Sequence, residues 1–122
     1  MKVLINERNE DIRKLYEVIF SPYEAEITFA EDADEAQASA ERDHFDLVLL
    51  DVGFPDMEGI AVADHLHSKV PDHSLVLVSS VPVAKIISEE LKKSISLFMK
   101  PLDIKGLQNL IRSRFHLAPS MA

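Results

Sequence analysis

The stretch Leu47-Val48-Leu49-Leu50-Asp51 places four consecutive apolar residues directly before an acid. A run this short, with no alternation of polar and apolar residues, predicts a strand buried on both faces, as in a parallel sheet. Similar runs occur at residues 3–5 (VLI), 75–78 (LVLV) and 97–99 (LFM). Residues 26–29 (EITF) alternate instead, which predicts an edge strand. Together these segments predict a five-stranded sheet.

Amphipathic patterns separate the strands. Asp32, with Glu35 three residues later, is a typical helix N-cap, and Asp103 precedes a helical pattern in the same way. Strand and helix therefore alternate five times, and right-handed crossovers turn this order into an α/β, doubly wound parallel sheet with helices on both faces. The apolar spacing predicts helices around residues 12–19, 33–40, 60–66, 83–91 and 104–115.

Length, composition and charge exclude several classes of function. A chain of 122 residues with 47% apolar residues is the size of one domain with its own core. The absence of cysteine excludes disulfides, thiolate metal sites and cysteine nucleophiles, and three glycines are too few for a glycine-rich phosphate loop. A net charge of −8 argues against direct nucleic-acid binding. No apolar run is long enough for a membrane span, and the N-terminus does not resemble a signal peptide, so we expect a cytoplasmic protein.

Charge is unevenly distributed. Residues 1–61 hold 16 acidic and 5 basic residues, whereas residues 62–122 hold 5 acidic and 8 basic residues. In open parallel sheets, sites form where the carboxyl ends of strands meet. This edge is predicted to carry carboxylates, hydroxyls and one ammonium, a set suited to a metal ion and a phosphoryl group. Its residues are Asn6, Glu7, Arg8, Asp51, Val52, Gly53, Ser79, Ser80, Lys100 and Pro101.

The sequence resembles the receiver domain of two-component response regulators over nearly its whole length. The stretches that carry the resemblance are KVLIN (2–6), DIRKL (11–15), DLVLLDVGFPDMEGI (46–60), LVLVSS (75–80) and MKPLD (99–103). The resemblance implies a flavodoxin-like fold with strand order 2-1-3-4-5. We expect the receiver domain to span residues 1–117 and residues 118–122 to be a disordered tail.

The resemblance also implies roles at the site. Asp51 would be the phosphoacceptor, the Ser79 hydroxyl would contact a phosphoryl oxygen, and Lys100 would pair with the phosphoryl group. Mg²⁺ would be bound by the carboxylates of Glu7 and Asp51 and by the Gly53 carbonyl. Such a domain is not an enzyme beyond Mg²⁺-dependent self-phosphorylation from a phosphodonor.

The sequence departs from the family pattern at Glu7, Arg8 and Leu97, and Ser79 stands where threonine is commoner. The family's two adjacent acids after the first strand correspond to Glu7 and Arg8. One added unit charge about 4 Å away is worth about 4 kcal/mol at an effective dielectric of about 20, so we expect weakened Mg²⁺ binding. Arg8 is a candidate for part of the ion's role, since guanidinium binds phosphate bidentately. Leu97 replaces an aromatic residue that relays activation in the family, and the Lys100–Pro101 bond is expected to be cis.

The expected partners are a histidine kinase or phosphotransfer protein, and a downstream protein that docks on the fourth helix, fifth strand and fifth helix. Neither nucleic acid nor membrane is an expected direct partner. Two alternatives remain. A degenerate receiver would act as a phosphorylation-independent interaction module, which Arg8 and Leu97 suggest. An aspartate-nucleophile phosphatase would carry an acid two residues after Asp51, where this chain has Gly53.

Overall fold

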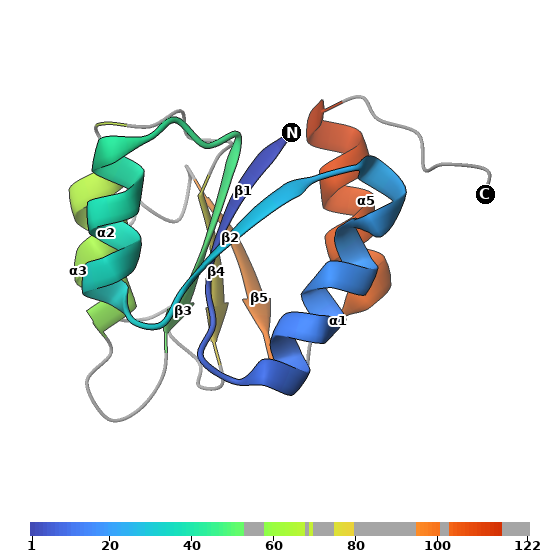
Figure 1. The fold of residues 1–122 in the computed structure, drawn as a ribbon, viewed down its shortest axis with the longest axis horizontal. Helices are drawn as coiled ribbons and strands as arrows, with labels where there is room; N and C mark the ends of the chain where they lie inside the picture. The colour runs from blue at the N-terminus through green and yellow to red at the C-terminus, as the bar shows by residue number, and fades with distance from the viewer. Residues whose placement is uncertain (53–57, 68, 70–74, 80–94, 101–102, 116–122) are drawn as a thin grey trace.

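A computed structural model of the chain describes residues 1–52, 58–67, 69, 75–79, 95–100 and 103–115. Five parallel strands form one sheet of order β2-β1-β3-β4-β5, so the predicted fold class and strand order are confirmed (Figure 1). The strands are β1 (Lys2–Asn6), β2 (Glu26–Ala30), β3 (Leu47–Val52), β4 (Leu75–Ser79) and β5 (Ser96–Met99).

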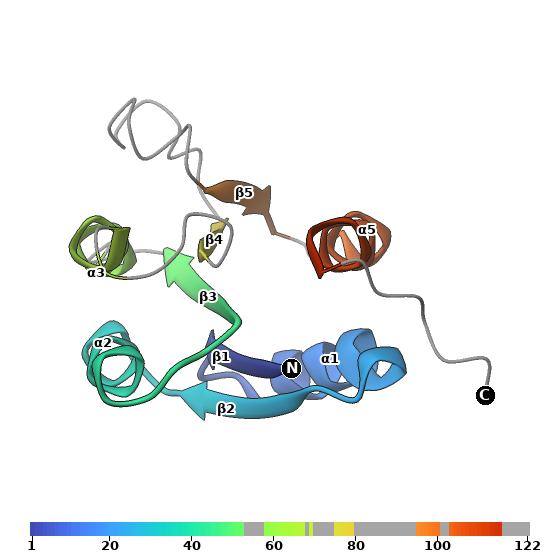
Figure 2. The same cartoon turned by 90° about the horizontal axis from the view of Figure 1, so that it is seen from above.

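Helices cover both faces of the sheet. In Figure 2, α1 and α5 lie on one side of the strands and α2 and α3 lie on the other, which gives the three layers of a doubly wound fold. The predicted helix at residues 83–91, the predicted tail at 118–122, Gly53 and Pro101 lie outside the described residues. The helical elements are α1 (Glu10–Phe20), the short 3₁₀ helix η1 (Ser21–Tyr23), α2 (Ala33–Arg42), α3 (Glu58–His67) and α5 (Ile104–Phe115).

The central strand β3 contributes to two cores, because successive side chains of a strand point to opposite faces. Leu49 packs with Tyr16 of α1 and Ile111 of α5 in one cluster. Val48 and Leu50 belong to the other cluster, beneath α2 and α3. All three of these β3 residues are at most 1% exposed. Burial of both faces explains why β3 reads as an unbroken apolar run.

The prediction of burial on both faces was wrong for β5. Leu97 and Met99 are 36% and 45% exposed, whereas Phe98 between them packs on the core cluster shared with α5. The reason is position, because β5 is the last strand of the sheet and only its Phe98 face meets that core. A three-residue run is too short to distinguish an edge strand from a central one.

The two predicted helix caps are confirmed. The Asp32 carboxylate accepts a hydrogen bond from the Glu35 N–H at 2.8 Å, and the Asp103 carboxylate accepts one from the Gly106 N–H at 3.0 Å. These caps begin α2 and α5 immediately after the strands and so keep the connections short. Among the described residues, no helix is both long and apolar enough to span a membrane.

Candidate functional site

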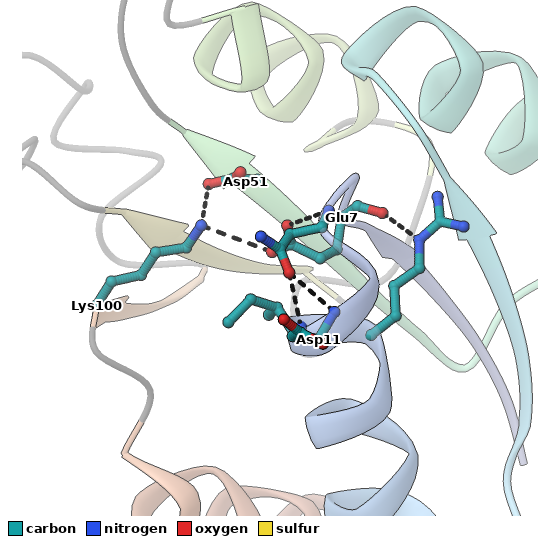
Figure 3. A network of polar contacts seen from close by, with 7 residues as sticks. Glu7, Asp11, Asp51 and Lys100 are labelled. Carbon is teal, nitrogen blue, oxygen red and sulfur yellow. Dashed lines mark hydrogen bonds and ion pairs between the residues drawn. The ribbon is translucent and has the colours of Figure 1, made fainter.

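Three segments bring Glu7, Asp51 and Lys100 together at the carboxyl edge of the sheet. Glu7 follows β1, Asp51 lies near the end of β3, and Lys100 follows β5. The Lys100 ammonium Nζ lies 3.2 Å from Asp51 Oδ1 and 3.6 Å from Glu7 Oε1 (Figure 3). One ammonium therefore faces two carboxylates, as expected where parallel strands end side by side.

The three side chains differ in exposure. The Glu7 side chain is only 6% exposed, whereas those of Lys100 and Asp51 are 27% and 31% exposed. Glu7 Oε1 and Asp51 Oδ1 are buried atoms that accept no hydrogen bond from the described residues, so the ammonium interacts with them as an ion pair without hydrogen-bond geometry. Asp51 is thus held by a cation on one oxygen and remains partly open to solvent.

The segment between β1 and α1 fixes Glu7 at three points. Its N–H donates to the Ala30 carbonyl at 3.0 Å, which extends the pairing of β1 with β2. Its Oε2 accepts a hydrogen bond from the Asn9 N–H at 3.1 Å, and its carbonyl oxygen accepts one from Arg13 Nε. The remaining oxygen, Oε1, faces Lys100. The position of Glu7 therefore depends on Arg13 and Asn9.

Neither Arg13 nor Asn9 was identified from the sequence. Asn9 is the N-cap of α1, and its Oδ1 accepts hydrogen bonds from Asp11 N–H and Ile12 N–H. Asparagine followed by acidic residues before an amphipathic segment is a recognisable cap signal. Arg13 also lies over the Phe29 ring, with its guanidinium carbon 5.0 Å from the ring centre. No local pattern predicts that contact.

Lys100 is positioned through its backbone. Its N–H donates to the Ser79 carbonyl at 2.7 Å and so continues the pairing of β5 with β4. Ser79 is fully buried at the end of β4, in register with Val52 of β3 and Met99 of β5. The predicted Ser79 and Lys100 are therefore neighbours at the edge of the sheet that carries Asp51.

The other predicted site residues lie in different environments. Arg8 is exposed and makes no hydrogen bond or ion pair within the described part of the chain. Leu97 lies on β5, three residues before Lys100, and is partly exposed. Gly53 and Pro101 lie outside the described residues, so the carbonyl ligand and the cis bond stay predictions.

The negative charge of the site affects the pKa of a buried tyrosine. Tyr16 of α1 is 2% exposed. Burial raises the pKa of its phenol, and the negative charges of Glu7 and Asp51 raise it further. The Tyr16 phenol therefore stays neutral over the physiological pH range.

The donor set fits a hard cation. Mg²⁺ takes oxygen ligands and is commonly bound by one or two carboxylates, with water and phosphate as its other ligands. Glu7 Oε1 and Asp51 Oδ1 are buried carboxylate oxygens without a hydrogen-bond donor among the described residues. Within the described residues, however, no group of three or more His, Cys, Asp or Glu side chains is suited to hold a metal ion. The acids that face Lys100 within the described residues are the two carboxylates of Glu7 and Asp51.

The chain combines a parallel sheet of order 2-1-3-4-5 with an acid and a lysine paired at its carboxyl edge. The model of the response regulator receiver domain family matches residues 3–112. The chain therefore belongs to the response regulator receiver domain family, and it is a receiver domain of the two-component type.

Curated relatives agree with this assignment. The chain is 26% identical over 117 residues to the response regulator protein PilR of Pseudomonas aeruginosa, covering 95% of this chain and 26% of PilR. It is 27% identical over 122 residues to the transcriptional regulatory protein KdpE of Staphylococcus aureus, covering 98% of this chain and 52% of KdpE. The chain thus spans about half or less of the length of these relatives.

Solved structures show the same fold. A CheY-like response regulator receiver domain protein from Methanospirillum hungatei superposes with a TM-score of 0.75 at 25% identity, covering 94% of this chain and 93% of that one. The response regulator TrrA from Thermotoga maritima, solved in complex with Mg²⁺ and BeF, gives a TM-score of 0.74 at 22% identity, covering 92% of this chain and 96% of that one.

Proposed function

We propose that Asp51 is the phosphoacceptor of this receiver domain and that a histidine kinase or phosphotransfer protein is the donor. The observation that carries the proposal is the 3.2 Å separation of Lys100 Nζ from Asp51 Oδ1. Asp51 is also partly exposed, so a donor can approach it. Phosphoryl transfer needs cationic groups that are in place before the reaction, because negative charge spreads over the transferred oxygens.

The proposed step is a displacement at phosphorus. An Asp51 carboxylate oxygen forms a bond to phosphorus while the P–N bond of the donor phosphohistidine breaks. The imidazole nitrogen keeps the electron pair and takes a proton from water. Lys100 then pairs with the phosphoryl oxygens, and the Ser79 hydroxyl serves as a donor to them. The product is an aspartyl phosphate, which makes the domain a phosphoacceptor rather than a classical enzyme.

Glu7 and Asp51 would hold Mg²⁺ in this proposal, with the Gly53 carbonyl as the third protein ligand. The bound ion supplies positive charge to the phosphoryl oxygens. Lys100 already faces both carboxylates, and Arg8 adds a second cation beside Glu7. We therefore propose that Mg²⁺ binding is weak.

Output would pass to a downstream protein through the region of β5, α5 and the predicted helix at residues 83–91. The described part of this region carries exposed apolar side chains on Leu97 and Met99. The phosphorylation-independent module is not favoured, because the nucleophile and its cation are both present and adjacent. The cytoplasmic location and the absence of a nucleic-acid partner stay predictions.

Acetyl phosphate labelling tests the proposal. The protein is incubated with acetyl phosphate and MgCl₂, and its intact mass is measured. We expect one phosphoryl adduct on the wild type, none on Asp51→Asn, and a normal adduct on the matched control Asp43→Asn, whose exposed acid lies at the end of α2. An adduct that persists in Asp51→Asn, or no adduct on the wild type, contradicts the proposal.

A further inference from the structure

Arg8 lies between two residues that are held by hydrogen bonds, Glu7 and Asn9. Glu7 is held by hydrogen bonds to Ala30 and to Arg13. Asn9 is held in place because it is the N-cap of α1. Within the described residues the Arg8 guanidinium is exposed and makes no hydrogen bond or ion pair. A long cationic side chain therefore begins at the residue next to Glu7, and no hydrogen bond or ion pair with another described residue fixes its position.

The other cation of the site is already shared. Lys100 Nζ faces Glu7 Oε1 at 3.6 Å and Asp51 Oδ1 at 3.2 Å, and neither oxygen accepts a hydrogen bond within the part of the chain that the structure describes. A phosphoryl group on Asp51 adds negative charge while Glu7 still attracts Lys100. A further cation would offset this charge, and Arg8, next to Glu7 in the sequence, has an exposed side chain without a partner within the described residues.

The total charge of the site determines whether it favours a bound metal ion or the Arg8 guanidinium. Glu7, Asp51, Lys100 and Arg8 have a formal charge of zero in total. A site of zero charge attracts a divalent cation weakly but tolerates the arrival of a phosphate dianion. Guanidinium also presents two parallel N–H donors, which match two phosphoryl oxygens.

We propose that Arg8 binds the phosphoryl oxygens of the donor and of phosphorylated Asp51, so that phosphorylation proceeds without a divalent metal. The inference rests on the proposed phosphoacceptor function. With acetyl phosphate as donor, an Asp51 oxygen–phosphorus bond forms as the P–O bond to acetate breaks. Acetate leaves with the bonding electron pair, and no oxidant or further proton is needed. Arg8 and Lys100 bind the oxygens throughout.

The first test compares labelling in EDTA with labelling in MgCl₂, followed by intact mass. We expect the wild type to gain the Asp51 adduct in EDTA and Arg8→Ala to lose metal-free labelling by about 100-fold, the effect of removing one such oxygen-binding donor. Arg8→Lys keeps a point charge without the paired donors and is expected to lie between them. Arg42→Ala, at the exposed end of α2, is the matched control and should label as the wild type does.

A second test measures phosphate binding in the absence of phosphoryl transfer. Inorganic phosphate is titrated in EDTA into Asp51→Asn, and the side-chain Nε–H resonances of Arg8 and Arg42 are followed by NMR. We expect a saturable shift at Arg8 and none at Arg42. Arg8→Asp is expected to bind Mg²⁺ at least about tenfold more tightly than the wild type in an amide NMR titration, because it restores an acidic pair.

The outcomes separate the two proposals. The Arg8 proposal is wrong if the wild type is labelled on Asp51 only with Mg²⁺ and Arg8→Ala is labelled with Mg²⁺ as fast as the wild type. The phosphoacceptor function then stands. Equal phosphate shifts at Arg8 and Arg42 also overturn it. If no condition gives an Asp51-dependent adduct, both proposals fail. Circular dichroism of each variant checks that folding is unchanged, as expected for an exposed side chain.

Discussion

Lys100 Nζ lies 3.2 Å from Asp51 Oδ1, although the two residues come from different halves of the chain and from strands that are not neighbours in the sheet. Their contact depends on the β3-β4-β5 register, in which Val52 pairs with Ser79 and Ser79 with Met99. The long side chain of Lys100 crosses the end of β4 to reach both Asp51 and Glu7. The sheet topology therefore determines the charge pair.

The first prediction concerns Lys100 and stability. Removing the ammonium leaves the nearly buried Glu7 carboxylate without a counter-ion, and breaking such a pair from one side costs up to about 3 kcal/mol. We expect Lys100→Met to lower the free energy of unfolding in urea. The loss should shrink in the Glu7→Gln background, because no buried charge is then left behind.

Lys105→Met is the matched control for this experiment. Lys105 is an exposed lysine in the first turn of α5, so its replacement should leave the free energy of unfolding nearly unchanged. Equal losses for Lys100→Met in the wild-type and Glu7→Gln backgrounds would show that Glu7 and Lys100 are not coupled.

The second prediction concerns the start of α1. Asn9→Ala removes the side-chain acceptor for two N–H groups, and the loss of such a cap costs about 1 kcal/mol. We expect Asn9→Ser to restore most of that loss, because serine is also a good N-cap. Urea unfolding of both variants measures the effect. Equal stability of Asn9→Ala and the wild type would contradict the role of the cap.

Sequence patterns predicted most of this fold because the strands of a doubly wound sheet are buried on both faces. Unbroken apolar runs such as that of β3 mark such strands, and the acid that ends the run marks the functional edge. The placement of Asp51, Ser79 and Lys100 at one edge of the sheet was predicted in this way. The family resemblance added their expected chemistry, which periodicity alone does not contain.

Contacts between distant side chains were not predictable. Nothing in the sequence near Arg13 indicates that it donates to the Glu7 carbonyl and lies over Phe29, because both contacts depend on how α1 packs against β1 and β2. The exposure of Leu97 was missed for a similar reason. A short apolar run does not reveal whether a further strand lies beside it.

The third prediction concerns an ion pair between α2 and α3. His65 Nε2 lies 2.6 Å from Glu41 Oε1, and this hydrogen bond, with a smaller contribution from Lys69, lowers the pKa of Glu41. A lowered pKa stabilises the fold above the ordinary value near 4.5, and that contribution is lost as the pH falls through the lowered value. We expect His65→Ala to raise the pKa of the Glu41 carboxyl in an NMR titration.

His44→Ala is the matched control for the Glu41 titration. His44 pairs with Asp46 directly before β3, and the interactions found among the described residues do not join it to Glu41. An unchanged Glu41 titration in His65→Ala would show that the hydrogen bond is absent in solution.

The last prediction concerns Tyr16 and high pH. Because burial and the charges of Glu7 and Asp51 raise its pKa in the folded state, the unfolded chain loses the phenolic proton first, near pH 10. The unfolded state then binds fewer protons than the folded state, so the free energy of unfolding falls as the pH rises above about 10. Tyr16→Phe removes this proton. The free energy of unfolding of the variant, measured in urea, should therefore fall less steeply than that of the wild type as the pH passes the ordinary tyrosine pKa of about 10. The absorbance of ionised tyrosine at high pH gives a second measurement, since the chain has only two tyrosines and Tyr16 should ionise only on unfolding. Parallel pH profiles for Tyr16→Phe and the wild type would mean that the phenol is accessible to water in the folded state.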